Sequence, residues 1–390
     1  MEPSDRLLST PFVLAVVAEF GVFVTVGMLL PVLPVFAAGP LDVGSVGVGL
    51  AVAAASPTAL LFQPLAGRVG DRRGRRLLVI SGALVVAGSV AAYTVADTLE
   101  LLVALRLVSG IGEALIFVGA ATIVVDLAPE GRRGEALSLY SLGLWGGLAI
   151  GPLLGELVLA DDRYDAVWLT AAGCSAAAAL LALALPETRP DATAKAPRPA
   201  RLVHPAAIGP GLVLVASVVG FAGFNAFVAL YARDLGLSGA GAVFLLFSGI
   251  VVGIRIFGRR LPDRLGAKKA SGSALVLLAA GLLTIGVWNA PIGLFVGTAV
   301  FAVGQALAFP ALMTLAVAAA PPTERSSVVG TFSACADVGF AVGALGLGGV
   351  AAATGYEGVF VVGALSSVAG ALLLARIPTA TTRVQPVEAS

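Results

Sequence analysis

The feature that most constrains this chain is a succession of long apolar segments separated by short polar turns. About 20 consecutive apolar residues are needed to cross the hydrocarbon core of a bilayer as a helix. Twelve such segments can be counted, at residues 10–37, 44–66, 77–96, 99–125, 135–160, 165–185, 206–232, 239–258, 271–288, 291–319, 327–353 and 357–377. Only 12% of the residues are charged, against about 25% in a soluble domain. The sequence therefore predicts an all-α membrane protein with twelve transmembrane helices.

The basic residues predict which side of the membrane each turn faces. The segment GRVGDRRGRR, residues 67–76, carries five arginines and one aspartate between two apolar segments, so we interpret it as a short turn in water. Short cytoplasmic loops carry an excess of Lys and Arg. Placing both termini and the even-numbered turns in the cytoplasm assigns 20 of the 24 basic residues to that side. We therefore expect a multi-pass protein of the plasma (cytoplasmic) membrane with both termini cytoplasmic.

The chain also contains an internal repeat. Three pairs of short matches share one offset of 192 residues: DRRG at 71–74 with DRLG at 263–266, GEAL at 112–115 with GQAL at 304–307, and Gly147 and Gly151 with Gly339 and Gly343. Agreement in a single register argues for duplication rather than chance. Six-helix halves repeated in the same orientation are related by an axis along the membrane normal, and transporters of this kind bind substrate between the halves.

A polar, proline-rich interval separates the sixth and seventh apolar segments. Its sequence, ETRPDATAKAPRPARLVHP at 187–205, has the composition of a flexible linker. We therefore predict an N-terminal six-helix bundle at 1–186 and a cytoplasmic linker at 187–205. A C-terminal six-helix bundle with a short cytoplasmic tail would occupy 206–390.

Two segments resemble motifs of the major facilitator superfamily. The turn at 67–76 resembles the signature between its second and third helices, with matches at Gly67, Asp71, Arg72, Gly74, Arg75 and Arg76 and departures at Val69 and Gly70. The segment GLWGGLAIGPLLGE resembles the fifth-helix motif of its 12-span drug/proton antiporters, with matches at Gly143, Gly147, Gly151, Pro152 and Gly155, and with Glu156 in place of a glycine. The resemblance implies two six-helix bundles related by a pseudo-twofold axis, the major facilitator fold, and efflux by antiport.

By this resemblance, the arginine-rich turn forms a latch between the two halves on the cytoplasmic side. Asp71 would accept hydrogen bonds at the N-terminus of the eleventh helix, near Ser326 and Ser327, where the helix dipole favours an anion. Arg75 would pair with Asp126 at the end of the fourth segment. The predicted latch consists of Gly67, Asp71, Arg72, Gly74, Arg75 and Asp126. The alternative is that these charges only orient the chain.

Four glycines of the fifth segment recur every four residues and form one stripe on a helix: Gly143, Gly147, Gly151 and Gly155. A stripe of small residues lets two helix backbones approach closely. Pro152 removes one backbone hydrogen bond and permits a bend. We expect this stripe to be a helix-packing surface that also serves a rocking motion of the halves.

Four charged residues lie well within apolar segments, away from the segment ends: Glu19, Arg106, Glu113 and Asp337. A charge at bilayer depth costs at least about 2.5–3.5 kcal/mol, which makes each a functional candidate. Arg106 also resembles the superfamily's intramembrane arginine, and Glu113 follows it by two helical turns on the same face. Desolvation and a nearby arginine act in opposite directions on a carboxyl group's proton affinity. We predict Glu113 as the first proton carrier, Glu19 as the second and Asp337 as the third; the alternative is a static ion pair of Arg106 with either glutamate.

Asn225 and Gln305 are candidate polar anchors of a mainly apolar substrate pocket. Aromatic residues of the spans could complete it: Phe20, Phe23, Phe221, Phe224 and Tyr231. Glu156, near the outer end of its segment, is expected to have a structural or gating role. Arg255 is expected to extend to the cytoplasmic surface.

The sequence contains no GxxxxGK[ST], HExxH or CxxC motif, so we expect neither an enzyme, nor a metal site, nor a cofactor, and we expect a proton gradient as the energy source. The predicted function is secondary active transport, a multidrug-type export of a small amphipathic or cationic compound in exchange for protons by rocking-bundle alternating access. The predicted partners are the small-molecule substrate, protons and the lipid bilayer, with no nucleic acid, and the chain is expected to be a monomer. Two alternatives are a metabolite symporter or uniporter whose anionic substrate is clamped by Arg106, and a membrane sensor or scaffold that transports nothing.

Overall fold

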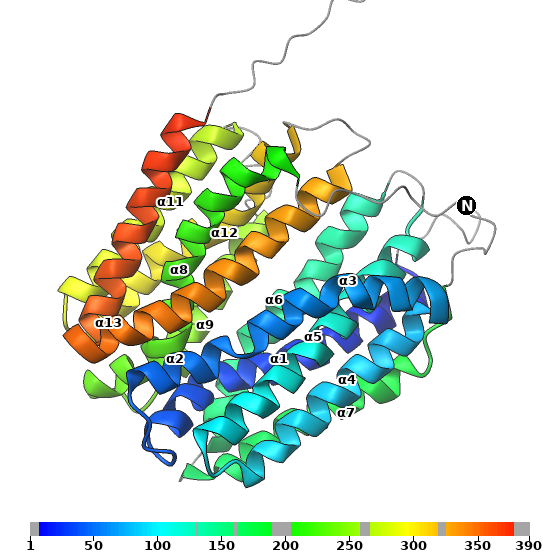
Figure 1. Ribbon diagram of the computed structural model, residues 1–390, viewed down its shortest axis with the longest axis horizontal. Coiled ribbons are helices and arrows are strands. Elements are labelled where there is room, and N and C mark those ends of the chain that lie inside the picture. The colour runs from blue at the N-terminus through cyan, green and yellow to red at the C-terminus, as the bar shows by residue number, and fades with distance from the viewer. Residues whose placement is uncertain are drawn as a thin grey trace, which may run out of the picture.

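The computed structural model describes residues 8–129, 132–159, 162–188, 204–257, 266–318 and 325–377 (Figure 1). Most of the predicted linker, the first three residues of DRLG and the C-terminal tail lie outside these ranges. Within them every regular element is a helix. The helices are α1 (Thr10–Ala38), α2 (Ser45–Ala53), α3 (Ala55–Arg73), α4 (Arg75–Ala91), the short 3-10 helix η2 (Ala92–Val95), α5 (Leu99–Leu127), α6 (Arg133–Leu159), α7 (Tyr164–Ala182), α8 (Pro205–Asp234), α9 (Gly241–Phe257), α11 (Ala267–Val287), α12 (Pro291–Ala318) and α13 (Arg325–Arg376).

Ten stretches of the described helices are long and apolar enough to cross a membrane, with α2 and α3 forming one of them. Two features separate this number from the predicted twelve. Helix α9 has only 17 residues. Helix α13 has 52 residues and is counted once, although its backbone leaves the helix at Gly355, where φ is 80°; Figure 1 shows its two arms, orange and red, meeting at an angle. The all-helical membrane fold is confirmed, and the number twelve stays a prediction.

The arginine-rich segment is more helical than we expected. Helix α3 continues through Arg73 and α4 begins at Arg75, so only Gly74 lies between them, with a φ of 104°. Side chains rarely tolerate this φ, and a Cβ on Gly74 would also collide with the carboxylate of Glu187. The expected ten-residue turn is therefore wrong. The helix continues beyond the apolar stretch because its exposed arginines lie in water, and one glycine reverses the chain.

The helices form two halves that each pack around their own interior (Figure 1). In the first half, α1 lies against α6 and α7, and α4 lies against α5 and α7. In the second, α8 lies against α13, and α11 lies against α12. The ring of Trp168 lies 5.4 Å from that of Phe36 in the first interior, and Phe224 lies 5.2 Å from Phe301 in the second. Edge-on and tilted rings at these separations add stability to each packed interior.

The two halves are closest at one end of the bundle. We call the end that carries Arg72 and Arg75 the arginine-rich end, and the other the opposite end. At the opposite end, Gly49 of α2 packs against the backbone of Ala344 in α13, and a Cβ on Gly348 would be 2.9 Å from the Ser45 carbonyl oxygen. Figure 1 shows α3 and the first arm of α13 diverging from there toward the arginine-rich end. The halves therefore meet at the opposite end and separate at the arginine-rich end.

Candidate functional site

A cavity of about 200 Å³ lies between the two halves. Its wall comes from both halves and consists of Val26, Leu29, Leu30, Leu33, Val52, Ala55, Ser56, Arg106, Glu113, Asn225 and Phe340. The lining is mainly apolar, with the charged pair Arg106 and Glu113 on α5 and the amide of Asn225 on α8 facing it across the halves. An apolar cavity with a few convergent polar groups is the usual composition of a small-molecule site.

Arg106 and Glu113 form the charged part of this wall. A guanidinium nitrogen of Arg106 lies 3.8 Å from a carboxylate oxygen of Glu113, which is an ion pair without a hydrogen bond. Arg106 also donates hydrogen bonds to the carbonyl oxygens of Ala51 at 3.3 Å and Val52 at 3.4 Å. These carbonyls belong to the last turn of α2, where the final carbonyl oxygens of a helix are available as acceptors. The helix break therefore supplies the acceptors that hold the arginine at the cavity.

A polar network behind Arg106 was not predicted from the sequence. The hydroxyl of Tyr93 is within hydrogen-bond distance of Ser109 at 3.0 Å, and Ser109 lies 2.8 Å from Ser89. Tyr93 also lies within electrostatic range of Arg106. The sequence did contain a signal for Ser109: it follows Arg106 by three residues, about one helical turn, and so lies near it on the same face. The network fixes the arginine from the side that does not face the cavity.

Glu19 lies outside the cavity wall, in a separate buried site between α1, α5 and α6. It is 0% exposed, and its Oε1 accepts a hydrogen bond of 2.5 Å from the hydroxyl of Tyr140. Its Oε2 has no hydrogen-bond partner among the described residues. The Tyr140 hydroxyl also lies 3.2 Å from the carbonyl oxygen of Phe117. Burying an ionised carboxylate without a cation is costly, whereas the protonated acid is neutral.

Tyr140 was missing from the sequence-based site, although a signal for it exists. It precedes Gly143 by three residues and Gly147 by seven, so it continues the glycine stripe of α6 by one turn. That stripe packs on α1, the helix of Glu19. The tyrosine therefore faces the glutamate for the same geometrical reason that the glycines face α1.

Asp337, the third predicted proton carrier, and Gln305, the second predicted anchor, lie outside the wall of this cavity. Asp337 on α13 accepts a hydrogen bond of 3.4 Å from the side-chain amide of Gln63 on α3, a contact between the halves, and it lies within electrostatic range of Glu113. Gln305 on α12 is not part of the cavity wall, and its Oε1 is buried without a partner among the described residues.

The expected aromatic pocket is corrected in part. Phe224 and Tyr231 are 0% and 1% exposed and lie in the packing of the second half. The Tyr231 hydroxyl is satisfied there by the carbonyl oxygen of Ile285 at 3.1 Å. Both were expected at the pocket because an aromatic residue in a span has no sequence signature that separates packing from binding. The aromatic residue that does line the cavity is Phe340.

The predicted latch has a buried arginine at its centre. Arg75 is 7% exposed and pairs with Asp71 at 3.2 Å and with Asp126 at 3.3 Å, as expected for the second pair. Its backbone N–H donates to Glu187 at 2.7 Å, so the carboxylate at the start of α4 comes from Glu187, which we had not predicted. The side chains of 325–327 lie outside the described ones, so the contact of Asp71 with the start of α13 stays a prediction.

The glycine stripe of α6 packs against α1 along its length. A Cβ added at Gly143 would be 2.8 Å from the Val16 carbonyl oxygen, and one added at Gly147 would be 2.7 Å from Phe23. A Cβ added at Gly151 would be 2.6 Å from the Gly27 Cα, and one added at Gly155 would be 2.6 Å from the Met28 carbonyl oxygen. Real Cβ atoms do not come this close to other atoms. The two backbones therefore touch wherever the stripe has a glycine, and α6 is fixed to α1. Helix α6 continues through Pro152.

Comparison with known proteins places these features in a family. The model of the Major Facilitator Superfamily matches residues 15–271 and 256–389. An uncharacterized MFS-type transporter of Salmonella typhimurium is 28% identical over 369 residues, which is 92% of this chain and 94% of that protein. An uncharacterized MFS-type transporter of Burkholderia mallei is 28% identical over 385 residues, covering 95% of this chain and 93% of that protein.

Solved structures show the same fold at lower identity. The nucleoside transporter NupG superposes with a TM-score of 0.75 at 15% identity, covering 94% of this chain and 98% of that one. The human organic anion transporter MFSD10 superposes with a TM-score of 0.72 at 20% identity, covering 96% of this chain and 100% of that one.

Proposed function

Because the chain belongs to the Major Facilitator Superfamily, we propose that it is a proton-coupled antiporter that exports a small amphipathic or cationic compound. The observation that carries the proposal is the Arg106–Glu113 pair in the wall of a cavity between the halves. A carboxylate in such a place is able to bind either a proton or a cationic group, and binding of one excludes the other. That exclusion is the requirement for antiport.

The loose geometry of the pair suits this exchange. The 3.8 Å separation between Arg106 and Glu113 lies outside hydrogen-bond distance, and the arginine is held independently by two backbone carbonyls. A cation that enters the cavity can therefore take the carboxylate without displacing the arginine. Asn225, from the other half, offers a polar contact to the same cargo. A cargo that touches both halves favours the arrangement in which they close around it.

The topology is part of the proposal. The arginine-rich end faces the cytoplasm because Lys and Arg concentrate in cytoplasmic loops. Counting α9 as one span and the arms of α13 as two gives twelve spans. The halves would then be closed on the outer side and separate on the cytoplasmic side, the arrangement in which an exporter takes up its cargo. Rocking of the halves about the cavity would release that cargo outside.

The coupling is tested in proteoliposomes with ethidium as the probe. We expect ethidium to move against its own gradient only when a pH gradient is imposed. Glu113→Gln should abolish this movement, because the amide keeps the volume and cannot exchange a proton. Glu100→Gln is the matched control, since Glu100 is an exposed residue in the first turn of the same helix. Ethidium uptake that ignores the pH gradient would remove the coupling.

A second candidate function also has an observation in its favour. One guanidinium nitrogen of Arg106, Nη1, is buried and has no hydrogen-bond partner among the described residues, so it could bind an anionic cargo. In that case Arg106→Lys, which keeps the charge and loses the planar fork, should weaken transport of carboxylates. Competition of the transported probe by organic anions, and not by organic cations, would select this alternative.

A further inference from the structure

Helix α6 has a second face, which contacts α9 of the other half. Trp145, Leu148 and Glu156 lie on this face at helical spacing. The guanidinium of Arg255 lies 4.5 Å from the ring centroid of Trp145, although we had expected this arginine to extend to water. Ser248 donates a hydrogen bond of 3.4 Å to the Leu148 carbonyl oxygen. These contacts are polar and join the two halves.

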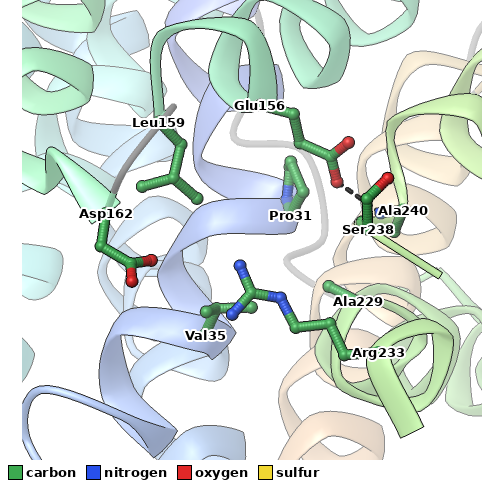
Figure 2. A pocket seen from close by; sticks show the side chains of 10 residues that line it. Pro31, Val35, Glu156, Leu159, Asp162, Ala229, Arg233, Ser238 and Ala240 are labelled. Carbon is green, nitrogen blue, oxygen red and sulfur yellow. Dashed lines mark hydrogen bonds between the residues drawn. The ribbon is translucent and has the colours of Figure 1, made fainter. Parts of the chain in front are cut away.

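Glu156 makes the contact at the opposite end. Its carboxylate accepts a hydrogen bond from the backbone N–H of Ala240, immediately before α9 begins, as Figure 2 shows, and it lies within electrostatic range of the N–H of Gly241. A Cβ on Gly239 would be 2.7 Å from the carboxylate, so a side chain at that position would displace it. The N-terminus of a helix carries a partial positive charge and unpaired N–H groups, both of which favour an anion.

Glu156 lines a cavity of about 340 Å³ between the halves at the opposite end. Two other charged residues line it, Asp162 from the chain after α6 and Arg233 from α8. Figure 2 shows the Arg233 side chain extending across the cavity and Asp162 on its far side, whereas Glu156 points to the start of α9. Glu156 is therefore the acidic residue of this cavity that bonds to the other half.

We propose that the carboxylate of Glu156 holds the two halves closed at the opposite end, and that neutralising it shifts the transporter toward the arrangement open at that end. The α2–α13 contacts at this end are close packing of small residues, at Gly49 and Gly348. Glu156 adds a charge-assisted bond to a helix terminus, which is stronger than a neutral bond. The carboxylate must leave α9 each time the halves separate there, so its charge sets the balance between the two arrangements.

Two cysteine reporters test the proposal in detergent, where a thiol reagent reaches both ends. Val35 lines the opposite-end cavity and is 5% exposed, so Val35→Cys reports opening at that end. Ala59 lies on α3 one turn before Gln63 and is half-buried, so Ala59→Cys reports closure toward the arginine-rich end. Both are placed in a background in which Cys174 and Cys335 are replaced by serine, and the rate of maleimide labelling is measured.

Glu156→Gln keeps the shape of the side chain and removes its charge. We expect it to raise the labelling rate at Val35→Cys about tenfold and to lower the rate at Ala59→Cys. Asp162→Asn is the matched control, because it neutralises a carboxylate of the same cavity, and it should leave both rates within about twofold. Gly241→Ala is a second variant on the other half: its Cβ would be 2.5 Å from the carboxylate, so it should shift both rates as Glu156→Gln does.

The outcomes separate a latch from a general structural role. The proposal is overturned if Glu156→Gln leaves both labelling rates at those of the parent. It is also overturned if both reporters label faster, because a general loosening of the structure would expose both ends, whereas the proposal requires slower labelling at Ala59→Cys. Equal effects of Asp162→Asn and Glu156→Gln overturn it as well. The measurement uses neither a cargo nor a pH gradient, so its result is independent of the proposed antiport.

Discussion

Removal of the Tyr140 hydroxyl tests whether Glu19 is held as a buried, hydrogen-bonded acid. In Tyr140→Phe the carboxyl group loses its hydrogen bond of 2.5 Å and keeps no described partner, while Glu19 remains 0% exposed. A buried polar group left without its partner costs about 1–3 kcal/mol. The phenyl ring fills the same space, so packing contributes little to the change. We expect the free energy of unfolding to fall by about 1–3 kcal/mol.

A double-mutant cycle isolates the Glu19–Tyr140 term. In a Glu19→Leu background the Phe117 carbonyl oxygen at 3.2 Å is the one partner that the Tyr140 hydroxyl retains among the described residues, so Tyr140→Phe should cost less than in the parent. The difference between the two backgrounds is the coupling energy, which for residues in contact is about 0.5–3 kcal/mol. Thermal unfolding of the purified protein in detergent measures each variant. A loss of 1 kcal/mol lowers the midpoint by about 2–4 °C in a unit of some 200 residues.

Tyr164→Phe is the matched control for this prediction. Its hydroxyl lies 3.5 Å from an oxygen of Asp162 at an exposed position, where substitutions change stability by no more than about 0.5 kcal/mol. The reasoning is wrong if Tyr140→Phe costs no more than this control, or if its cost is the same with and without Glu19. Either result would mean that the hydroxyl does not hold the carboxyl group.

Two further predictions use the same thermal assay. Gly151→Ala should destabilise the protein by about 1–3 kcal/mol through overpacking, because its Cβ would be 2.6 Å from the facing α1 backbone. Gly146→Ala is the control and should be close to neutral, because its nearest contact would be at 3.4 Å. Equal effects of the two substitutions would contradict the close α1–α6 packing. Arg75→Gln should cost about 1–3 kcal/mol by leaving Asp126 without its ion pair. The exposed Arg72→Gln is its control, and equal losses would mean that the Arg75 ion pairs do not contribute to stability.

The sequence predicted those parts of the site in which both partners lie on one helix or in one motif. Arg106 and Glu113 share a face of α5 because they are two turns apart, and the intramembrane cost of charge marks both as exceptional. Whether such a face points to a cavity depends on the neighbouring helices, and here the wall agrees with the prediction. Local spacing within one helix was therefore sufficient to find this pair.

Partners from different helices could not be predicted in the same way. The hydrogen bonds from Tyr140 to Glu19 and from Gln63 to Asp337 join residues 121 and 274 positions apart. Such a pair depends on which helix faces touch, and a single sequence does not determine the rotation of each helix about its own axis. Burying a neutral tyrosine or glutamine side chain in a membrane also costs less free energy than burying a charged one. Nothing in the sequence therefore marks these two residues as exceptional.

The two faces of α6 offer a physical basis for the proposed alternating movement. Along one face, backbone contact with α1 leaves no space for a Cβ, and separating such a surface would lose its close contacts at every glycine. Along the other face, three polar contacts to α9 involve side chains that can release one partner at a time. In the proposed mechanism, helix α6 would therefore move with the first half, and the α6–α9 surface would be where the halves shift against each other. Because the glycine-packed face joins α6 closely to α1, the proposed effect of the Glu156 charge would act on the position of an entire half rather than on one helix.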